Sequence, residues 1–208
     1  MEIFDETVEF KNDRYVVHLR FRKSHDELSD NYSLAKQRFQ NLWRKFSHDP
    51  ELHQQYHEII RDYVEQGIIE EVKDDIKGNE SNRPLYYLPH LAVREEGRLT
   101  SKTRIVFDAG SHQNNELSLN DCLWPGKNLN PNILDLLIDF RLNKTAVCSD
   151  IKQAFLQICL AEEHKDAVRF LWSNEEPCVH KKNQIACISF QSSEFRRKLE
   201  PISARCHN

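Results

Sequence analysis

Hydrophobic side chains recur at two different spacings along the first third of the chain, and each spacing predicts a different element. Residues 7–10 and 15–21 alternate between apolar and polar side chains, as in a β-strand with one buried face, and the polar residues 11–14 between them predict a turn. In residues 35–64 the apolar side chains recur every three or four positions, which is the spacing of a half-buried helix. The pattern therefore predicts a strand pair followed by helical structure.

The helical region divides into two helices. The first follows the capping sequence Ser29-Asp30-Asn31, and the second begins at Asp49-Pro50-Glu51, where the missing proline N–H costs nothing. Gly67 is well placed to end the second helix. The two apolar stripes are rich in aromatic residues, and we interpret them as the core between the helices, not as a platform for stacking bases. They contain Ala35, Phe39, Leu42, Trp43, Phe46, Leu52, Tyr56, Ile59, Ile60, Tyr63 and Val64.

From Ile68 onwards, short apolar stretches alternate with polar connectors. Residues 85–93 and 104–107 are expected to form strands joined by a turn at Gly97, and Asn130 is expected to cap a helix that begins at Pro131. We further expect a short apolar stretch at 68–72, a charged connector at 74–84 and a loop at 114–127. Residues 145–149 are expected to form a buried strand, residues 151–160 a helical turn that runs into extended chain, and residues 168–172 a last strand. Helices and strands mix without strict alternation, which predicts an α+β fold.

The change of pattern also divides the chain. Residues 1–75 form an upstream strand pair with two helices, and residues 76–172 form the part with short strands. Residues 173–208 show only weak periodicity, at 185–190, and are expected to be a divergent, poorly ordered tail. The net charge of −4 is unevenly distributed: residues 1–75 are acidic, residues 76–172 are balanced and residues 173–208 are slightly basic. No part has the strongly basic character of an autonomous nucleic-acid binder, so binding would depend on local positive clusters.

Composition excludes several classes of protein. The 208 residues contain only five glycines, too widely spaced for a dinucleotide-binding G-x-G-x-x-G or a phosphate-binding P-loop. No apolar run approaches the length of a membrane span, and the start MEIFDETVEF is acidic, unlike a signal or transit peptide. We therefore expect an intracellular protein, cytoplasmic or nuclear and not secreted, without a membrane partner.

The cysteine and histidine residues raise the question of a metal site, but their spacing along the chain does not favour one. The six cysteines form no C-x-x-C, and reduced thiols are expected. His53 and His57 would share a helix face but lack an obvious third ligand. A second set, Cys178, His180, Cys187 and Cys206-His207, matches no known zinc finger, so we favour solvated or core side chains.

Asp150 is the strongest single candidate for chemistry. It directly follows the predicted strand at 145–149, where a carboxylate would be held rigidly at the edge of a sheet. Mg²⁺ prefers such oxygen ligands and commonly shares them with substrate phosphates. Taken alone, the position fits a helix N-cap as well as a metal ligand.

Several stretches in the same order resemble the reverse transcriptases of LTR retrotransposons, most closely those of the Bel-Pao group. In residues 76–172 they are SKTRIVFDA, SLNDCL, AVCSDIKQAFLQICL and DAVRFLW. Upstream, DRYVVHLRFR, LSDNYSLAKQRFQNLWRKF and YHEIIRDYVEQGIIEEV are similar to the segment that precedes the polymerase core of that family. The resemblance covers about residues 7–172 and implies a partial right-hand polymerase fold, with the fingers and the start of the palm.

The resemblance also implies roles for individual residues. Asp150 matches the first catalytic aspartate, which binds both Mg²⁺ ions, and Ile151 matches the position whose carbonyl is a further metal ligand. Arg104 matches the fingers arginine that contacts the incoming triphosphate, and Lys102 is a looser match to a basic fingers position. The partners implied are an RNA or DNA template-primer, a dNTP and the rest of a polyprotein. For Arg104 the alternative is a surface ion pair, for example with Asp108.

Two further positions match the sugar pocket of the family. Phe155 matches the aromatic steric gate that excludes a ribose 2′-OH, and Ala154 belongs to the same pocket. The alternative for Phe155 is simple core packing.

The chain also departs from the family. No Tyr-x-Asp-Asp is present, no aspartate follows Asp166, and the only adjacent aspartates, Asp74-Asp75, lie upstream of the first motif. We therefore expect a truncated reverse-transcriptase-like domain, an RNA-directed DNA polymerase by descent that is inactive alone. The alternatives are a non-enzymatic nucleic-acid- or protein-binding remnant, and a decayed element product with no stable role.

Overall fold

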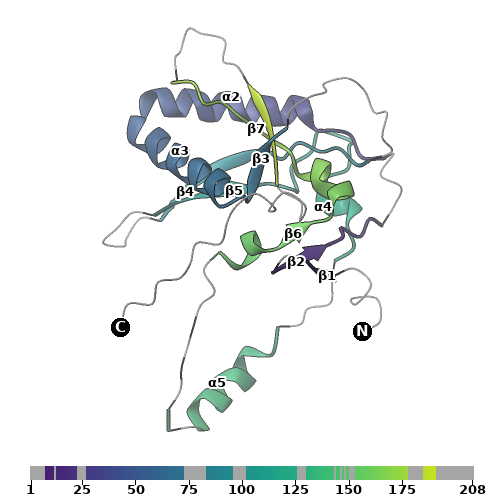
Figure 1. Ribbon diagram of the computed structural model, residues 1–208, viewed down its shortest axis with the longest axis vertical. Coiled ribbons are helices and arrows are strands. Elements are labelled where there is room, and N and C mark those ends of the chain that lie inside the picture. The colour runs from purple at the N-terminus through teal and green to yellow at the C-terminus, as the bar shows by residue number, and fades with distance from the viewer. Residues whose placement is uncertain are drawn as a thin grey trace.

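The computed structural model describes most of the chain and gives an α+β fold, as predicted. The described residues are 8–11, 13–22, 27–72, 83–95, 102–125, 130–142, 144–145, 147, 149, 153–177 and 185–190. Two helices, α2 and α3, lie together over small sheets, and a further helix, α5, lies apart from the rest (Figure 1). No helix among the described residues is both long enough and apolar enough to cross a membrane.

The two predicted helices are present as α2 (Tyr32–His48) and α3 (Pro50–Glu65). The cap of α3 follows the prediction, because the Asp49 carboxylate accepts a hydrogen bond from the Leu52 N–H at 2.9 Å. The cap of α2 differs: Asn31 is buried in the left-handed region, with φ 55°, and its side chain does not cap the helix. Its amide donates instead to the carbonyl oxygens of Tyr87 and Ser111, at 3.2 and 3.1 Å.

Three small sheets carry the strands. β1 (Val8–Lys11) and β2 (Arg14–Val17) form the predicted antiparallel pair, and β6 (Cys159–Leu160) adds to β2 in parallel. β4 (His90–Glu95) and β5 (Lys102–Phe107) form the predicted hairpin. The strand expected from residue 85 starts only at His90, because Pro89 has no N–H to give to a ladder.

The third sheet corrects the prediction of a poorly ordered tail. Its order is β3 (Ile69–Glu71), β8 (Ala186–Phe190) and β7 (Phe170–Trp172), so the tail supplies the central strand. Both neighbours are antiparallel to β8, with Ile69 opposite Phe190 and Phe170 opposite Ile188. The expectation was wrong for residues 186–190 because their apolar run is short and their pairing partners are distant in sequence.

The largest core cluster lies between α2, α3 and this third sheet. Trp172 is 1% exposed at its centre and stacks on Tyr56, with ring centroids 5.3 Å apart and an interplanar angle of 13°. The cluster contains the aromatic residues of both stripes, so their interpretation as core is confirmed, except that Val64 at the end of the second stripe is 52% exposed. His53 and His57 contact the same aromatic cluster with their rings, and both are half-buried at its edge.

Two other predicted segments need correction. The expected loop at 114–127 contains a short helix, α4 (Leu119–Cys122), which the reciprocal hydrogen bonds between Ser118 and Asp121 stabilise as a capping box. The expected buried strand at 145–149 is wrong for its described residues, since none of them lies in a strand and Val147 is 85% exposed. This segment follows α5, which lies apart from the core, so no sheet edge is described beside it (Figure 1).

Helix α5 (Ile133–Leu142) confirms the predicted helix but begins two residues after Pro131, with Asn132 Oδ1 accepting from the Leu134 N–H at 3.0 Å, and it buries none of its residues. Its apolar side chains are 49–76% exposed, although seven of its ten residues are Ile, Leu or Phe. A helix with such a face normally packs it against another element.

Candidate functional site

The β4–β5 hairpin carries the two basic positions that the resemblance assigns to the fingers. Arg104 lies opposite Val93 in the hairpin, and Lys102 lies opposite Glu95 at the end where the connection between the two strands begins. Because side chains alternate along a strand, Thr103 is buried and donates a hydrogen bond to Gln55 of α3, whereas the Arg104 side chain is exposed. The hairpin is thus anchored on α3 by one face and presents Arg104 on the other.

The face of the hairpin that packs on α3 also holds one more basic residue, Arg94, which lies opposite Thr103. Arg94 makes an ion pair with Asp49 at 3.1 Å between Nη1 and Oδ2, at the start of α3. Hydrogen bonds to Asp49, first from the Leu52 N–H and then from Arg94, lower the pKa of its carboxyl group. Arg94 is therefore engaged in joining the hairpin to the helix.

Ala154 and Phe155 lie on η2 (Ala154–Gln157), a single 3₁₀ turn that leads into β6. The Phe155 side chain is 89% exposed, so the core-packing alternative for this residue is wrong. Ala154 is half-buried beside it. Gln153 precedes the turn in the left-handed region, with φ 53°, and redirects the chain into it.

Two of the predicted site residues, Asp150 and Ile151, lie outside the described residues. The others fall on two separate elements. Lys102 and Arg104 belong to the β4–β5 hairpin, which packs on α3, and Ala154 and Phe155 belong to the turn that precedes β6 in the β1–β2–β6 sheet. The structure thus brings the predicted residues together as two pairs.

A cavity of about 220 Å³, which no sequence pattern indicated, lies beside Phe155. Its lining includes side chains from β2, η2, β6 and β8, so it forms where two of the sheets approach each other. The lining is apolar except for one guanidinium group and one thiol. Its members include Arg14, Phe155, Leu156, Ile158, Cys159 and Phe190.

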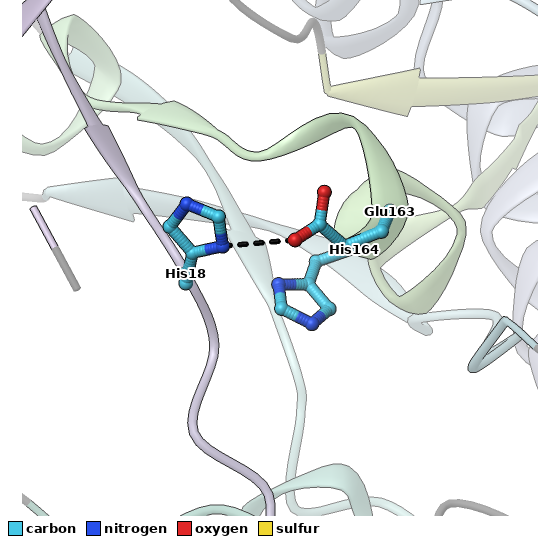
Figure 2. A group of neighbouring side chains, drawn as sticks. All are labelled: His18, Glu163 and His164. Carbon is cyan, nitrogen blue, oxygen red and sulfur yellow. Dashed lines mark hydrogen bonds and ion pairs between the residues drawn. The ribbon is translucent and has the colours of Figure 1, made fainter. Parts of the chain in front are cut away.

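A second group of side chains that the sequence did not indicate is His18, Glu163 and His164, whose potential ligand atoms lie within 4.8 Å of one another (Figure 2). His18 follows β2, and the other two lie on η3 (Glu162–Val168), a 3₁₀ segment. His18 Nδ1 lies 2.9 Å from Glu163 Oε1, and the Leu19 N–H donates to His164 Nδ1 at 3.1 Å.

These contacts decide what the cluster can do chemically. Hydrogen bonds, first from its own backbone N–H and then from His18, lower the pKa of Glu163, so its carboxylate is the charged acceptor for the His18 N–H. The ring nitrogen of His164 that accepts from Leu19 has no free lone pair for a cation. Two imidazoles and a carboxylate are residue types that bind zinc. Here, however, they already hydrogen-bond to one another and to the backbone, and these bonds join the segment after β2 to η3.

The second histidine and cysteine set from the sequence is only partly described. Cys187 lies in β8, where its thiol is 3.8 Å from the Tyr87 hydroxyl. Cys178, His180, Cys206 and His207 lie outside the described residues. Cys122, Cys159 and Cys187 form no disulfide within the described part of the chain.

Comparisons with known proteins provide no relative. No family model matches the chain, and no curated protein and no solved structure is similar to it. A functional assignment therefore depends on the residues themselves and on their placement.

Proposed function

We propose that this chain is a reverse-transcriptase-type domain, of the kind found in Bel-Pao LTR retrotransposons, with a partial right-hand polymerase fold. The order of its motifs along residues 7–172 is the sequence support. The structural observation that carries the proposal furthest is the exposure of Phe155, at 89%, on the turn directly after the Asp150 motif. A large aromatic side chain in that place is free to contact a bound sugar.

The hairpin gives further support. In the proposed role, Arg104 offsets charge on the triphosphate of an incoming nucleotide, and for this it must reach solvent. Its side chain does so, because Thr103 and Gln55 hold the opposite face of β5 against α3. Lys102 lies two positions away on the same strand and would add positive charge near the template-primer.

The set of carboxylates in these 208 residues does not fit a two-magnesium polymerase site. Asp150 would supply one of the carboxylates, and no Tyr-x-Asp-Asp is present to supply the others. Loss of a single catalytic group typically removes orders of magnitude in rate. We therefore expect this chain alone to bind substrates of the polymerase reaction without catalysing it.

Primer extension on a homopolymer template with Mg²⁺ tests this expectation, with Asp150→Asn as the matched variant. We expect no incorporation above background from either protein. Template-dependent incorporation by the wild type that Asp150→Asn abolishes would show that the site is complete and would overturn the expectation of inactivity.

A non-enzymatic binding remnant is the second candidate, and the exposed apolar face of α5 favours its protein-binding form. The nucleic-acid-binding form predicts binding to RNA or DNA whose affinity falls as salt rises, and which substitution of Arg94, Lys102 or Arg98, the last outside the described residues, weakens. Absence of binding to either nucleic acid at low salt would exclude the nucleic-acid form of this candidate. A decayed product without a stable role is the third, and insoluble expression would favour it.

A further inference from the structure

The cavity beside Phe155 contains a buried cation without a matching anion. Arg14 of β2 is 9% exposed, and the only interaction of its side chain in the described part of the chain is a 3.8 Å contact from Nη1 to the Cys159 thiol. Its Nε is buried with no hydrogen-bond partner. Among the described residues that line the cavity, Arg14 is also the only charged one.

Such an arrangement is energetically unfavourable on its own. A guanidinium removed from water loses its hydration, and a thiol is only a weak acceptor that returns little of that loss. Because Nη1 makes the contact with Cys159, the N–H groups of Nε and Nη2 are left to donate side by side, and this spacing matches the two oxygens of a carboxylate. An anion bound in the cavity would therefore satisfy the most costly polar group of this region.

The rest of the lining limits which anion would fit. Leu156, Ile158 and Phe190 present apolar surface, which favours a ligand with a hydrocarbon body behind its charged group. A single guanidinium balances one negative charge, whereas a phosphate carries nearly two at neutral pH. At about 220 Å³ the cavity is also smaller than the roughly 300–1,000 Å³ typical of sites for drug-sized ligands.

We propose that this cavity binds a small apolar monocarboxylate, with the carboxylate on Arg14 and the hydrocarbon part against Leu156, Ile158 and Phe190. Phe155 is both exposed and part of the lining, so it lies at the open side of the cavity. The proposal does not rest on polymerase ancestry, because its ligand is neither a nucleotide nor a nucleic acid.

The test uses the full chain and three probes: hexanoate, the uncharged 1-hexanol and inorganic phosphate. Binding is followed through the Nε–H signal of Arg14 in two-dimensional ¹H–¹⁵N NMR spectra and by calorimetry. We expect saturable binding of hexanoate that moves the Arg14 signal, with at least about tenfold weaker binding of 1-hexanol and of phosphate. Equal binding of hexanoate and 1-hexanol, no binding of hexanoate, or tighter binding of phosphate would each overturn the proposal.

Two variants separate the role of Arg14 from a general effect of charge. Arg14→Gln should weaken hexanoate binding at least about tenfold, and Arg44→Gln, at an exposed position of α2, should not change it. Because Arg14→Gln removes a buried unpaired charge, the variant should unfold at the same or a higher urea concentration than the wild type without ligand. Unchanged hexanoate binding in folded Arg14→Gln would contradict the proposal. The wild-type comparison of hexanoate with 1-hexanol decides the question even if that variant does not fold.

Discussion

Acid should destabilise this protein through a single buried histidine, His90. It is 4% exposed at the start of β4, between α2, α3 and β7. Its Nε2–H donates to the Leu171 carbonyl oxygen at 2.8 Å, and the Tyr56 hydroxyl donates to its Nδ1. Both ring nitrogens are therefore satisfied in the neutral form, whereas a protonated ring would require the Tyr56 hydroxyl to turn from donor to acceptor.

The size of the effect follows from the pKa. Burial lowers the pKa of His90 from 6.5 to about 4, since the charged ring would lose its hydration. The unfolded chain binds this proton at a higher pH than the folded protein, so the stabilisation is complete above pH 6.5 and is lost as the pH falls from 6.5 towards 4. The free energy of unfolding should fall by about 2 kcal/mol at pH 5 and by about 3 kcal/mol below pH 4.

Urea unfolding followed by tryptophan fluorescence, from about pH 8 down to about pH 4, measures this loss. His90→Gln is the matched variant, because glutamine offers a donor and an acceptor in a similar place but does not titrate. Other groups, including His53, whose pKa burial also lowers, change both proteins alike. We expect the stability difference between wild type and variant to shrink as the pH falls. Parallel pH profiles of the two proteins would refute the reasoning, and His48→Gln on α2 controls for loss of an exposed histidine.

Three further predictions concern the fold. Asn31→Ala should lower the free energy of unfolding by about 1–3 kcal/mol, because the carbonyl oxygens of Tyr87 and Ser111 lose their donor; an unchanged urea midpoint would contradict this. Ile188→Ala should lower it by about 2–4 kcal/mol, because Ile188 is 5% exposed in the central strand β8, and a loss below about 0.5 kcal/mol would place β8 outside the core. Leu134→Lys combined with Leu137→Lys should raise the soluble yield and leave the urea midpoint unchanged, since both side chains are at least half exposed; a lower midpoint would show that α5 is packed.

Local patterns explain which elements of the fold were predictable. Helices α2 and α3 each present an apolar stripe over four turns, and α3 begins at a recognisable cap, so local sequence specifies them without reference to the rest of the chain. β8 could not be predicted in the same way, because its five residues become a strand only through pairing with β3 and β7. The four-residue helix α4 is too short for a period, and only its capping box marks it.

The candidate sites likewise include residues that local sequence marks and residues that only distant pairing brings together. The motif order allowed Arg104 and Phe155 to be singled out, but their exposure depends on which face of β5 packs on α3 and on where η2 turns. The contacts between His18 and Glu163, and between Arg14 and Cys159, join residues 145 positions apart. No spacing of residues along the sequence indicates that such distant residues lie together. Their existence depends on the parallel pairing of β2 with β6, which only the folded chain reveals.

The central claim is that this domain descends from a polymerase that reads a template and binds the matching nucleotide. It is tested most directly by fluorescence anisotropy on a labelled RNA template–DNA primer, with and without the next complementary dNTP, in the presence of Mg²⁺. The account predicts that the complementary dNTP tightens primer–template binding by the wild type more than a mismatched one does. Arg104→Gln should lose this effect and Arg44→Gln should keep it. Primer–template affinity that is independent of the added dNTP, or a dNTP effect that survives in Arg104→Gln, would contradict the account.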